Sequence, residues 1–294
     1  MDAADLRVFE TVCRLGGMNR AAEALHTVQS NVTARIRALE AELGQPLFER
    51  HARGVTPTAA GERLLPYARD IRQMLAEAAA AVRDDGTPRG PLLVGSLETT
   101  AALRLSPVLA RYAAAWPEVD VTLRTGTSCE LVEDVLAGRL EGAFVCGPVR
   151  HGDLTARDMF SEELVLLTPP GVDGAEALHG LSGVRILVLR AGCSYRQRLE
   201  EALARRGVVG LRRLEFGTLD AIIGCVAAGL GVTLLPRGIA EDAAGSLRIH
   251  ALPPQEAMVT TQFIHRRSAR MSSALRAFLD LAGDASSTAV EAAA

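Results

Sequence analysis

The stretch AEALHTVQSNVTARIRALE, residues 22–40, has the apolar spacing of a helix at both ends and a mostly polar segment, HTVQSN, in its middle. Ala22 and Leu25 give the first part a buried face, and Val32, Ile36 and Leu39 give one to the second part. The pattern predicts two helices joined by a tight turn. The second starts near residue 29 and ends at the glycine at position 44.

The second of these predicted helices also has a polar face. Its members are Gln29, Ser30, Asn31, Thr33 and Arg35. Side chains of these types form hydrogen bonds with base edges and phosphates, and a second helix presented after a tight turn can enter a major groove. The sequence therefore predicts a helix-turn-helix in which these five residues contact DNA.

The flanking segments complete a small domain. Residues 5–15 have helical spacing and stop at a Gly-Gly pair, and Asn19 is expected to cap the next helix. The stretch PLFERHARGVTPTAAGERLL, residues 46–65, predicts a short hairpin with a basic tip and a new helix capped by Thr58. Such a wing would place Arg50 and Arg53 near phosphate or a minor groove. Periodicity alone fits a three-helix core with solvated arginines equally well.

Residues 20–68, RAAEALHTVQSNVTARIRALEAELGQPLFERHARGVTPTAAGERLLPYA, closely resemble the winged helix-turn-helix of LysR-type transcriptional regulators. Members of that family usually carry Gln-Pro/Ser-Ala-Val-Ser where this chain has QSNVT, so Asn31 replaces a small residue on the reading face. The resemblance implies control of transcription by binding double-stranded DNA. A dimer with two symmetric DNA-binding domains would bind an imperfect inverted repeat. RNA polymerase is a further candidate partner.

Residues 59–85 predict one long helix with an apolar stripe of heptad spacing. The stripe consists of Leu64, Ala68, Ile71, Leu75, Ala78 and Val82. The stripe could pack on its own domain, whereas the resemblance implies an antiparallel dimerisation helix within a homodimer or homotetramer. Residues 84–91, DDGTPRGP, have the composition of a linker.

Strands and helices alternate beyond the linker in two series, and extended crossovers at 163–168 and 258–265 join them. Alternation of this kind predicts parallel sheets with helices on both faces, here in two lobes with a cleft between them. This resembles the periplasmic-binding-protein-like effector domain of the same regulators. The expected organisation is a DNA-binding domain at 1–58, a linker helix and hinge at 59–90, and an α/β effector domain at 91–294. Lobe I would span 91–162 and 264–283 and lobe II 163–263, with a disordered tail at 284–294.

Four polar clusters follow predicted strands: GSLETTAA at 95–102, RTGTSCE at 124–130, LRAGCSYR at 189–196 and EFGTLDA at 215–221. Ligands of α/β lobes bind at strand ends against helix N-termini, which attract anions. We therefore expect a small polar, anionic effector between the lobes, although Glu98 could instead favour an amine. The candidate residues are Ser96, Glu98, Thr99, Thr100, Thr125, Thr127, Ser128, Cys193, Ser194, Tyr195, Gly217 and Thr218. In the family, positions matching Thr99, Thr100 and Thr127 usually hold effectors; the alternative is that these hydroxyls only cap helices.

The cysteines and the composition exclude several classes of protein. Five scattered cysteines without a CxxC pair predict neither a disulfide framework nor a zinc site. Cys193 at a helix start could be reactive, but a small structural residue fits that position better. All 32 basic residues are arginine, which excludes P-loop and Schiff-base enzymes, and GxGxxG, HExxH and GxSxG are absent. No metal or cofactor is expected.

Charge and hydropathy are compatible with a soluble regulator. The net charge is −3, and residues 1–90 hold 12 arginines and 12 acidic residues, so a DNA contact must be a local basic patch. No apolar run of membrane-spanning length and no export signal are present, which predicts a cytoplasmic protein without membrane contact. The alternative is a small-molecule binding protein or enzyme with an appended helical domain, but none of the six histidines lies in a catalytic pattern.

Overall fold

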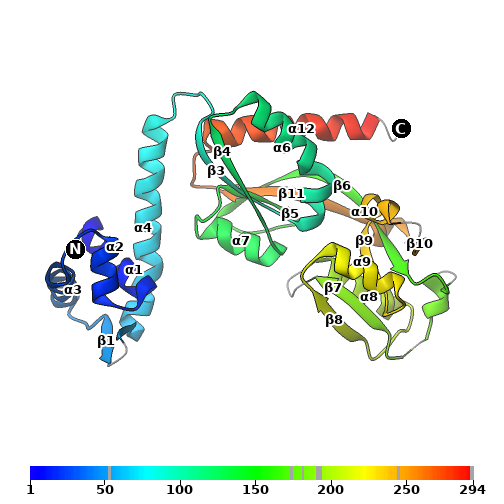
Figure 1. Ribbon diagram of the computed structural model, residues 1–294, viewed down its shortest axis with the longest axis horizontal. Helices are drawn as coiled ribbons and strands as arrows, with labels where there is room; N and C mark the ends of the chain where they lie inside the picture. Colours follow the sequence, from blue (N-terminus) through cyan, green and yellow to red (C-terminus); the bar gives the residue numbers. More distant parts are fainter. Residues whose placement is uncertain (52–53, 173–174, 181, 190–193, 244–245, 292–294) are drawn as a thin grey trace. The chain divides into compact units, whose positions relative to one another are not determined.

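The computed structural model describes residues 1–51, 54–172, 175–180, 182–189, 194–243 and 246–291. The chain divides into two compact units, Met1–Arg83 and Asp84–Ala294, each of which is considered by itself. Figure 1 shows the helices and strands of both.

The first unit is a helical domain with a two-stranded wing. It contains α1 (Ala3–Leu15), α2 (Met18–Ala24), α3 (Gln29–Leu43), the antiparallel strands β1 (Phe48–His51) and β2 (Gly54–Pro57), and α4 (Ala59–Arg83). Its core holds Phe9, Val12, Ile36, Leu39 and Leu47, each at most 2 % exposed. The helix-turn-helix and wing predicted from the sequence are confirmed.

The turn between α2 and α3 differs in detail from the expectation. Asn19 does not cap α2, because the helix already begins at Met18 and its N-cap is Gly17 in extended conformation. The turn is closed by a backbone hydrogen bond from the Thr27 N–H to the Ala22 carbonyl, 2.9 Å long. His26 takes a left-handed conformation with φ of 51°, which only a minority of non-glycine residues adopt.

Helix α4 uses its apolar stripe in two ways. Thr58 caps the helix, since its hydroxyl accepts the Gly61 N–H at 3.1 Å. In the first half of the helix Ala68 is buried, and Leu64 and Ile71 pack partly against the core of the first unit. The second half is exposed, with Leu75 at 53 % and Val82 at 88 %. Packing on its own domain therefore accounts only for the first part of the stripe.

The second unit begins with lobe I, a five-stranded part of a mixed sheet. Strand β3 (Gly90–Ser96) pairs in parallel with β4 (Val119–Thr125) and β5 (Gly142–Cys146), and β11 (Met258–Arg266) is antiparallel to β5 and to β6 (Leu154–Thr168). Helices α6 (Ser106–Ala115) and α12 (Ser273–Glu291) cover one face, and α7 (Ser128–Leu136) covers the other (Figure 1). After β3 the chain enters α5 (Glu98–Thr100) and a π-helical turn, η1 (Ala101–Leu105).

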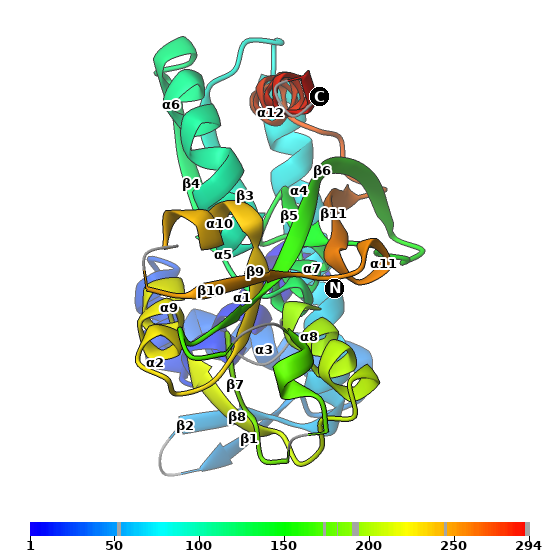
Figure 2. The ribbon, with the colours of Figure 1, turned by 90° about the vertical axis from the view of Figure 1, so that its right-hand side faces the viewer.

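Lobe II contains a second parallel pair, β7 (Arg185–Leu189) with β8 (Arg212–Phe216). Its other elements are η2 (Ala175–Leu178), α8 (Ser194–Arg205), α9 (Leu219–Ala227), β9 (Thr233–Pro236), α10 (Arg237–Asp242), β10 (Arg248–Ala251) and α11 (Pro254–Ala257). The far half of β6 pairs antiparallel with β9 and β10, so this one strand belongs to both lobes (Figures 1 and 2). The expected two-lobed α/β fold is confirmed, with antiparallel strands added to the predicted parallel ones.

Two expected boundaries of the second unit need correction. The whole of β11 from Met258 pairs with β6 and β5, so residues 258–263, expected in lobe II, are part of the sheet of lobe I. The tail expected to be disordered from 284 continues α12 as far as Glu291. Residues 292–294 lie outside the described part.

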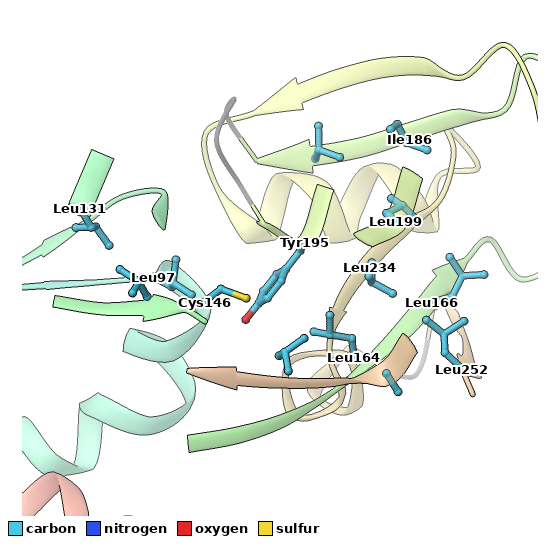
Figure 3. Packing of buried hydrophobic residues seen from close by; sticks show 14 of the residues in the cluster. Leu97, Leu131, Cys146, Leu164, Leu166, Ile186, Tyr195, Leu199, Leu234 and Leu252 are labelled. Carbon is cyan, nitrogen blue, oxygen red and sulfur yellow. The ribbon is translucent and has the colours of Figure 1, made fainter. Parts of the chain in front are cut away.

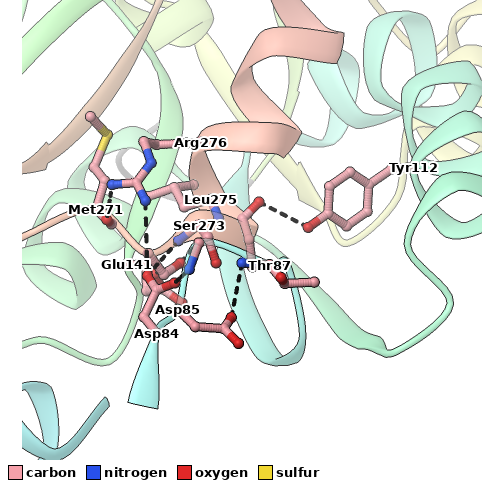
Figure 4. Close-up of polar contacts among 12 residues, drawn as sticks. Asp84, Asp85, Thr87, Tyr112, Glu141, Met271, Ser273, Leu275 and Arg276 are labelled. Atoms are coloured by element: carbon pink, nitrogen blue, oxygen red, sulfur yellow. Dashed lines mark hydrogen bonds and ion pairs between the residues drawn. The ribbon is translucent and has the colours of Figure 1, made fainter. Parts of the chain in front are cut away.

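The segment expected to be a linker is fixed to lobe I at its first residues (Figure 4). The Asp84 carboxylate accepts the Ser273 N–H at 2.8 Å, at the start of α12, and hydrogen bonding by the Ser273 side chain and backbone lowers the pKa of Asp84. Nearby, Glu141 accepts the Ser272 hydroxyl at 2.8 Å, and burial raises the pKa of Glu141. Because β3 already begins at Gly90, only a few residues remain between these contacts and the sheet.

Candidate functional site

The exposed face of α3 is the candidate nucleic-acid surface of the first unit. Gln29, Ser30 and Asn31 are exposed and Thr33 is half-buried, while Val32 on the opposite side is buried. The Gln29 amide donates to the Thr33 hydroxyl at 2.9 Å, and the Asn31 amide donates to the Thr27 hydroxyl at 3.1 Å. These bonds order the side chains before any partner binds.

The two arginines of α3 lie in different surroundings. Arg35 lies at the edge of the buried face, where its Nη1 is 2.9 Å from Asp5 Oδ1 and 3.9 Å from Asp2 Oδ1 at the start of α1. Arg37 is exposed and forms no ion pair with any residue that the structure describes. It follows Ser30 by seven residues, or two helical turns, and so shares the polar face. Sequence reasoning missed Arg37, although this spacing marks it.

The wing is held against the helical core. The Val55 N–H donates to the Gly16 carbonyl at 3.1 Å. A Cβ on Gly54, whose φ is 135°, would lie 2.3 Å from that same oxygen, so only glycine fits there. Arg50 is exposed on β1 opposite Val55, whereas Arg53 lies outside the described residues.

The second unit contains a cavity of about 430 Å³ between its lobes, hereafter the inter-lobe cavity. This size suits a small metabolite. Its described lining residues are Leu97, Glu98, Thr99, Thr125, Gly126, Thr127, Glu130, Cys146, Leu189, Ser194, Tyr195, Gly217 and Thr218. Eight of them were predicted from the sequence, and the four polar clusters do meet at one place.

Four predicted effector residues are not among the described lining residues. Ser96 is fully buried, and its hydroxyl donates to the Leu97 carbonyl at 2.9 Å. Thr100 is 2 % exposed and does not line the cavity. Ser128 lies behind the cavity wall, and its hydroxyl accepts the Cys146 N–H at 3.2 Å. Cys193 lies outside the described residues.

Five lining residues were missed by sequence reasoning: Leu97, Gly126, Glu130, Cys146 and Leu189. Leu97, Cys146 and Leu189 follow or end strands whose apolar residues look like ordinary core. Glu130 has the signature of a capping box with Thr127, and it forms one: its carboxylate accepts the Thr127 N–H at 2.9 Å.

Hydrogen bonds between described residues connect the lobes at the inter-lobe cavity. Thr99 Oγ1 lies 3.3 Å from Tyr195 Oη, the Ser194 hydroxyl donates to Ser128 Oγ at 3.3 Å, and the Leu219 N–H donates to Glu98 Oε1 at 3.4 Å. Tyr195 extends from α8 of lobe II toward Cys146 and Leu97 of lobe I (Figure 3). The structure is therefore a form in which the lobes touch directly through cavity-lining side chains.

Other site types are not found among the described residues. No group of three or more His, Cys, Asp or Glu residues is placed there to hold a metal ion. In the same part of the chain, no helix is both long and apolar enough to cross a lipid bilayer.

A winged helix-turn-helix followed by a two-lobed domain with a cavity between the lobes defines a DNA-binding regulator that carries a ligand-binding domain. Residues 3–62 match the family model of the bacterial regulatory helix-turn-helix proteins of the LysR family, and residues 85–287 match the LysR substrate binding domain. The chain belongs to the LysR family of transcriptional regulators. Its members bind DNA and small-molecule effectors and are not enzymes.

Curated relatives match almost the whole chain. It is 41% identical over 276 residues to the HTH-type transcriptional regulator GltR of Bacillus subtilis, with 93% of each chain covered. It is 46% identical over 283 residues to the uncharacterized HTH-type transcriptional regulator YusT of the same organism, with 95% of each covered.

Solved structures share the fold at lower identity. A full-length OxyR variant from Pseudomonas aeruginosa has a TM-score of 0.69 at 21% identity, covering 97% of this chain and 94% of that one. Full-length CbnR in complex with its target DNA has a TM-score of 0.67 at 24% identity, covering 97% of this chain and all of the other (100%).

Proposed function

We propose that helix α3 enters the major groove and that Gln29, Ser30, Asn31 and Thr33 contact base edges there, with Arg37 beside them. The observation that carries the proposal is the exposed, internally ordered polar face of α3. Side-chain amides and hydroxyls are the groups that read bases, and arginine binds guanine or phosphate. CbnR, which shares the fold, is known in complex with its target DNA, and this is compatible with DNA binding by the present chain.

Arg35 and the wing have supporting roles in the proposed contact with DNA. Because the Arg35 charge is balanced by Asp5, a DNA contact from it would first have to break that ion pair. Arg50 binds phosphate beside the groove, and Arg53 is assigned the same role on sequence grounds alone. A protein with this task acts in the cytoplasm, where bacterial DNA lies.

The exposed second half of α4 is the proposed dimerisation surface. Leu75, Ala78 and Val82 continue the heptad stripe without packing on the first unit, and exposed apolar stripes of this kind pair with a second helix. A homodimer, or a homotetramer built from two dimers, would present pairs of α3 helices to an imperfect inverted repeat. RNA polymerase is the partner through which a bound regulator would change transcription.

A small effector in the inter-lobe cavity is the proposed signal. The cavity is lined by side chains from both lobes, and several of them also bridge the lobes, so a ligand there favours one lobe arrangement over another. We assign contacts to Thr99, Thr125, Thr127, Ser194, Tyr195 and Thr218, and supporting positions behind the cavity to Ser96 and Ser128. Thr100, the other threonine of this cluster, is buried outside the described lining and is assigned no contact. Cys193, from the cluster at 189–196, remains in the proposed set on sequence grounds alone.

Sequencing of genomic fragments retained by the purified protein tests the DNA-binding proposal. We expect enrichment of a few inverted repeats, and loss of this enrichment in a variant with Ser30→Ala and Asn31→Ala. Retention without sequence preference, or unchanged enrichment in the variant, would refute the assignment of α3.

A matched pair of threonine variants tests the effector proposal. Thr99→Val, at a residue that lines the cavity, should reduce effector-dependent changes in DNA binding, whereas Thr100→Val, one residue further and outside the described lining, should not. An equal response of both variants would contradict the placement of the effector.

A further inference from the structure

The described lining residues of the inter-lobe cavity have the wrong charge for the anionic effector expected from the sequence. They include two carboxylates, Glu98 and Glu130, and no arginine or histidine. An anion placed there would face two negative groups at close range in a partly desolvated space, which is unfavourable.

Four backbone amides at the starts of α7 and α9 that could attract an anion are hydrogen-bonded within the protein itself. At α7, Thr127 Oγ1 accepts the Glu130 N–H at 3.3 Å, and the Glu130 carboxylate accepts the Thr127 N–H. At α9, Thr218 Oγ1 accepts the Ala221 N–H at 3.3 Å and Glu98 accepts the Leu219 N–H. These amides are therefore not available to a ligand carboxylate.

The arginines on neighbouring elements are also engaged. Arg124 at the end of β4 pairs with Asp134 at 2.8 Å, and Arg104 in η1 pairs with Glu162 at 2.8 Å. Arg196 in α8 pairs with Glu200 at 3.2 Å. None of these three guanidinium groups lines the cavity.

Glu98 is a cavity carboxylate without a cationic partner among the described residues. It is half-buried just after β3, and the hydrogen bond that it accepts from the Leu219 N–H is long, at 3.4 Å. Neither oxygen is paired with a cation of the described chain. A half-buried carboxylate gains most from a charged hydrogen-bond donor, and an ammonium group offers three N–H donors.

We propose that the effector of this protein carries a protonated amine that binds the Glu98 carboxylate inside the inter-lobe cavity. This inference rests on the proposed effector function of the cavity and specifies its ligand class. The hydroxyls of Thr125 and Thr218 line the same space and accept the remaining N–H groups. Because Glu98 also holds the start of α9, an amine bound to it acts at a contact between the two lobes.

Three probes of similar length separate the ligand classes: pentane-1,5-diamine, 5-aminopentanoate and pentanedioate. Each is added at millimolar concentration to the full-length protein, and binding is followed by calorimetric titration and thermal unfolding. We expect at least one amine to bind and pentanedioate not to bind. Glu98→Gln keeps the shape and removes the charge, so amine affinity should fall about tenfold or more. The two amines distinguish a purely cationic ligand from one that also carries a carboxylate.

Two further variants make the test specific. Glu133→Gln removes an equal charge from the exposed face of α7, outside the described lining, and should leave amine binding unchanged. Arg190 follows Leu189 in the sequence, beyond the described residues, so Arg190→Gln is included to detect an anion site. Pentanedioate binding that Arg190→Gln abolishes would overturn the inference while supporting the cavity as an effector site.

The remaining outcomes of these binding experiments also decide whether the amine inference holds. Equal amine affinity in the wild type and in Glu98→Gln would overturn the inference, and so would the absence of amine binding. DNA retention by the same preparations separates this failure from a failure of the proposed function. A protein that still selects its DNA sites but binds no probe leaves the α3 assignment intact, whereas loss of both would reject the two together.

Discussion

Arg37 and Arg35 provide a sharp test of how α3 meets DNA, because they are two residues apart and carry the same charge. Arg37 lies on the exposed polar face without an ion-pair partner among the described residues, whereas Arg35 is tied to Asp5 at 2.9 Å. Arg37→Ala should therefore weaken DNA binding more than Arg35→Ala does.

The magnitude follows from counterion release. Each phosphate contact contributes about 0.9 to the slope of log affinity against log salt concentration. The slope should therefore decrease in magnitude by about 1.8 in a dimer that lacks Arg37 in both DNA-binding domains. Raising the salt from about 50 to 200 mM would then shrink the gap between wild type and Arg37→Ala by roughly tenfold. Arg35→Ala should instead cost about 0.5 kcal/mol of folding stability, as is usual for an exposed ion pair.

Fluorescence anisotropy with the selected DNA site across a salt series measures the slopes, and urea unfolding measures the stabilities. A constant loss of affinity with an unchanged slope would assign Arg37 to a base edge rather than to a phosphate. The reasoning is refuted if Arg37→Ala binds as the wild type does, or if Arg35→Ala shows the larger loss of affinity.

Four further substitutions test the fold. His26→Gly should stabilise the first unit by about 0.5 kcal/mol, because relief of the left-handed strain exceeds the entropic cost of glycine; a lower Tm would contradict this. Gly142→Ala should destabilise the second unit by roughly 2 kcal/mol or more, since its Cβ would lie 2.1 Å from the Phe263 ring. Gly224→Ala, in open space within α9, should instead stabilise the second unit by about 1 kcal/mol. Urea unfolding midpoints of the two variants that shift in the same direction would refute this pair of predictions. The pKa of Asp84 lies below its usual value of 3.8, so its charge stabilises the fold above that pH and this contribution fades as pH falls through the lowered value. The gap in Tm between wild type and Asp84→Asn should therefore be constant near neutrality and shrink below about pH 4; a gap that grows in acid would be inconsistent.

Local periodicity made the first unit readable from the sequence. The apolar positions of α3 and the glycines that end α1 and α3 depend on neighbours a few residues away, so their pattern is visible without the fold. Arg37 was not predicted as a contact residue because the polar face was defined from residues close together in the sequence and was not followed along two helical turns. Arg37 has no acidic partner among the described residues, whereas Arg35 pairs with Asp5. Both facts depend on how α1 packs beside α3.

The second unit was less readable because its sheet depends on distant pairings. The alternation of strands and helices predicted the parallel pairs, but nothing local shows that β6 runs antiparallel through both lobes or that β11 joins lobe I from Met258. The cavity lining was only partly predicted for a similar reason. Consecutive helical residues point about 100° apart, so Thr99 lines the cavity and Thr100 does not.

Lobe contact and ligand binding use the same groups in this protein. Glu98, Thr99 and Ser194 line the inter-lobe cavity, and each also takes part in a hydrogen bond between the lobes. A ligand that binds these groups must either replace a lobe-to-lobe hydrogen bond with its own or add to it, and its binding energy then depends on how far the lobes are separated. Since a ligand shifts a conformational equilibrium only by its differential affinity for the two states, these shared groups are where such a difference arises. A ligand held by one lobe alone would bind both arrangements equally and could not act as a signal.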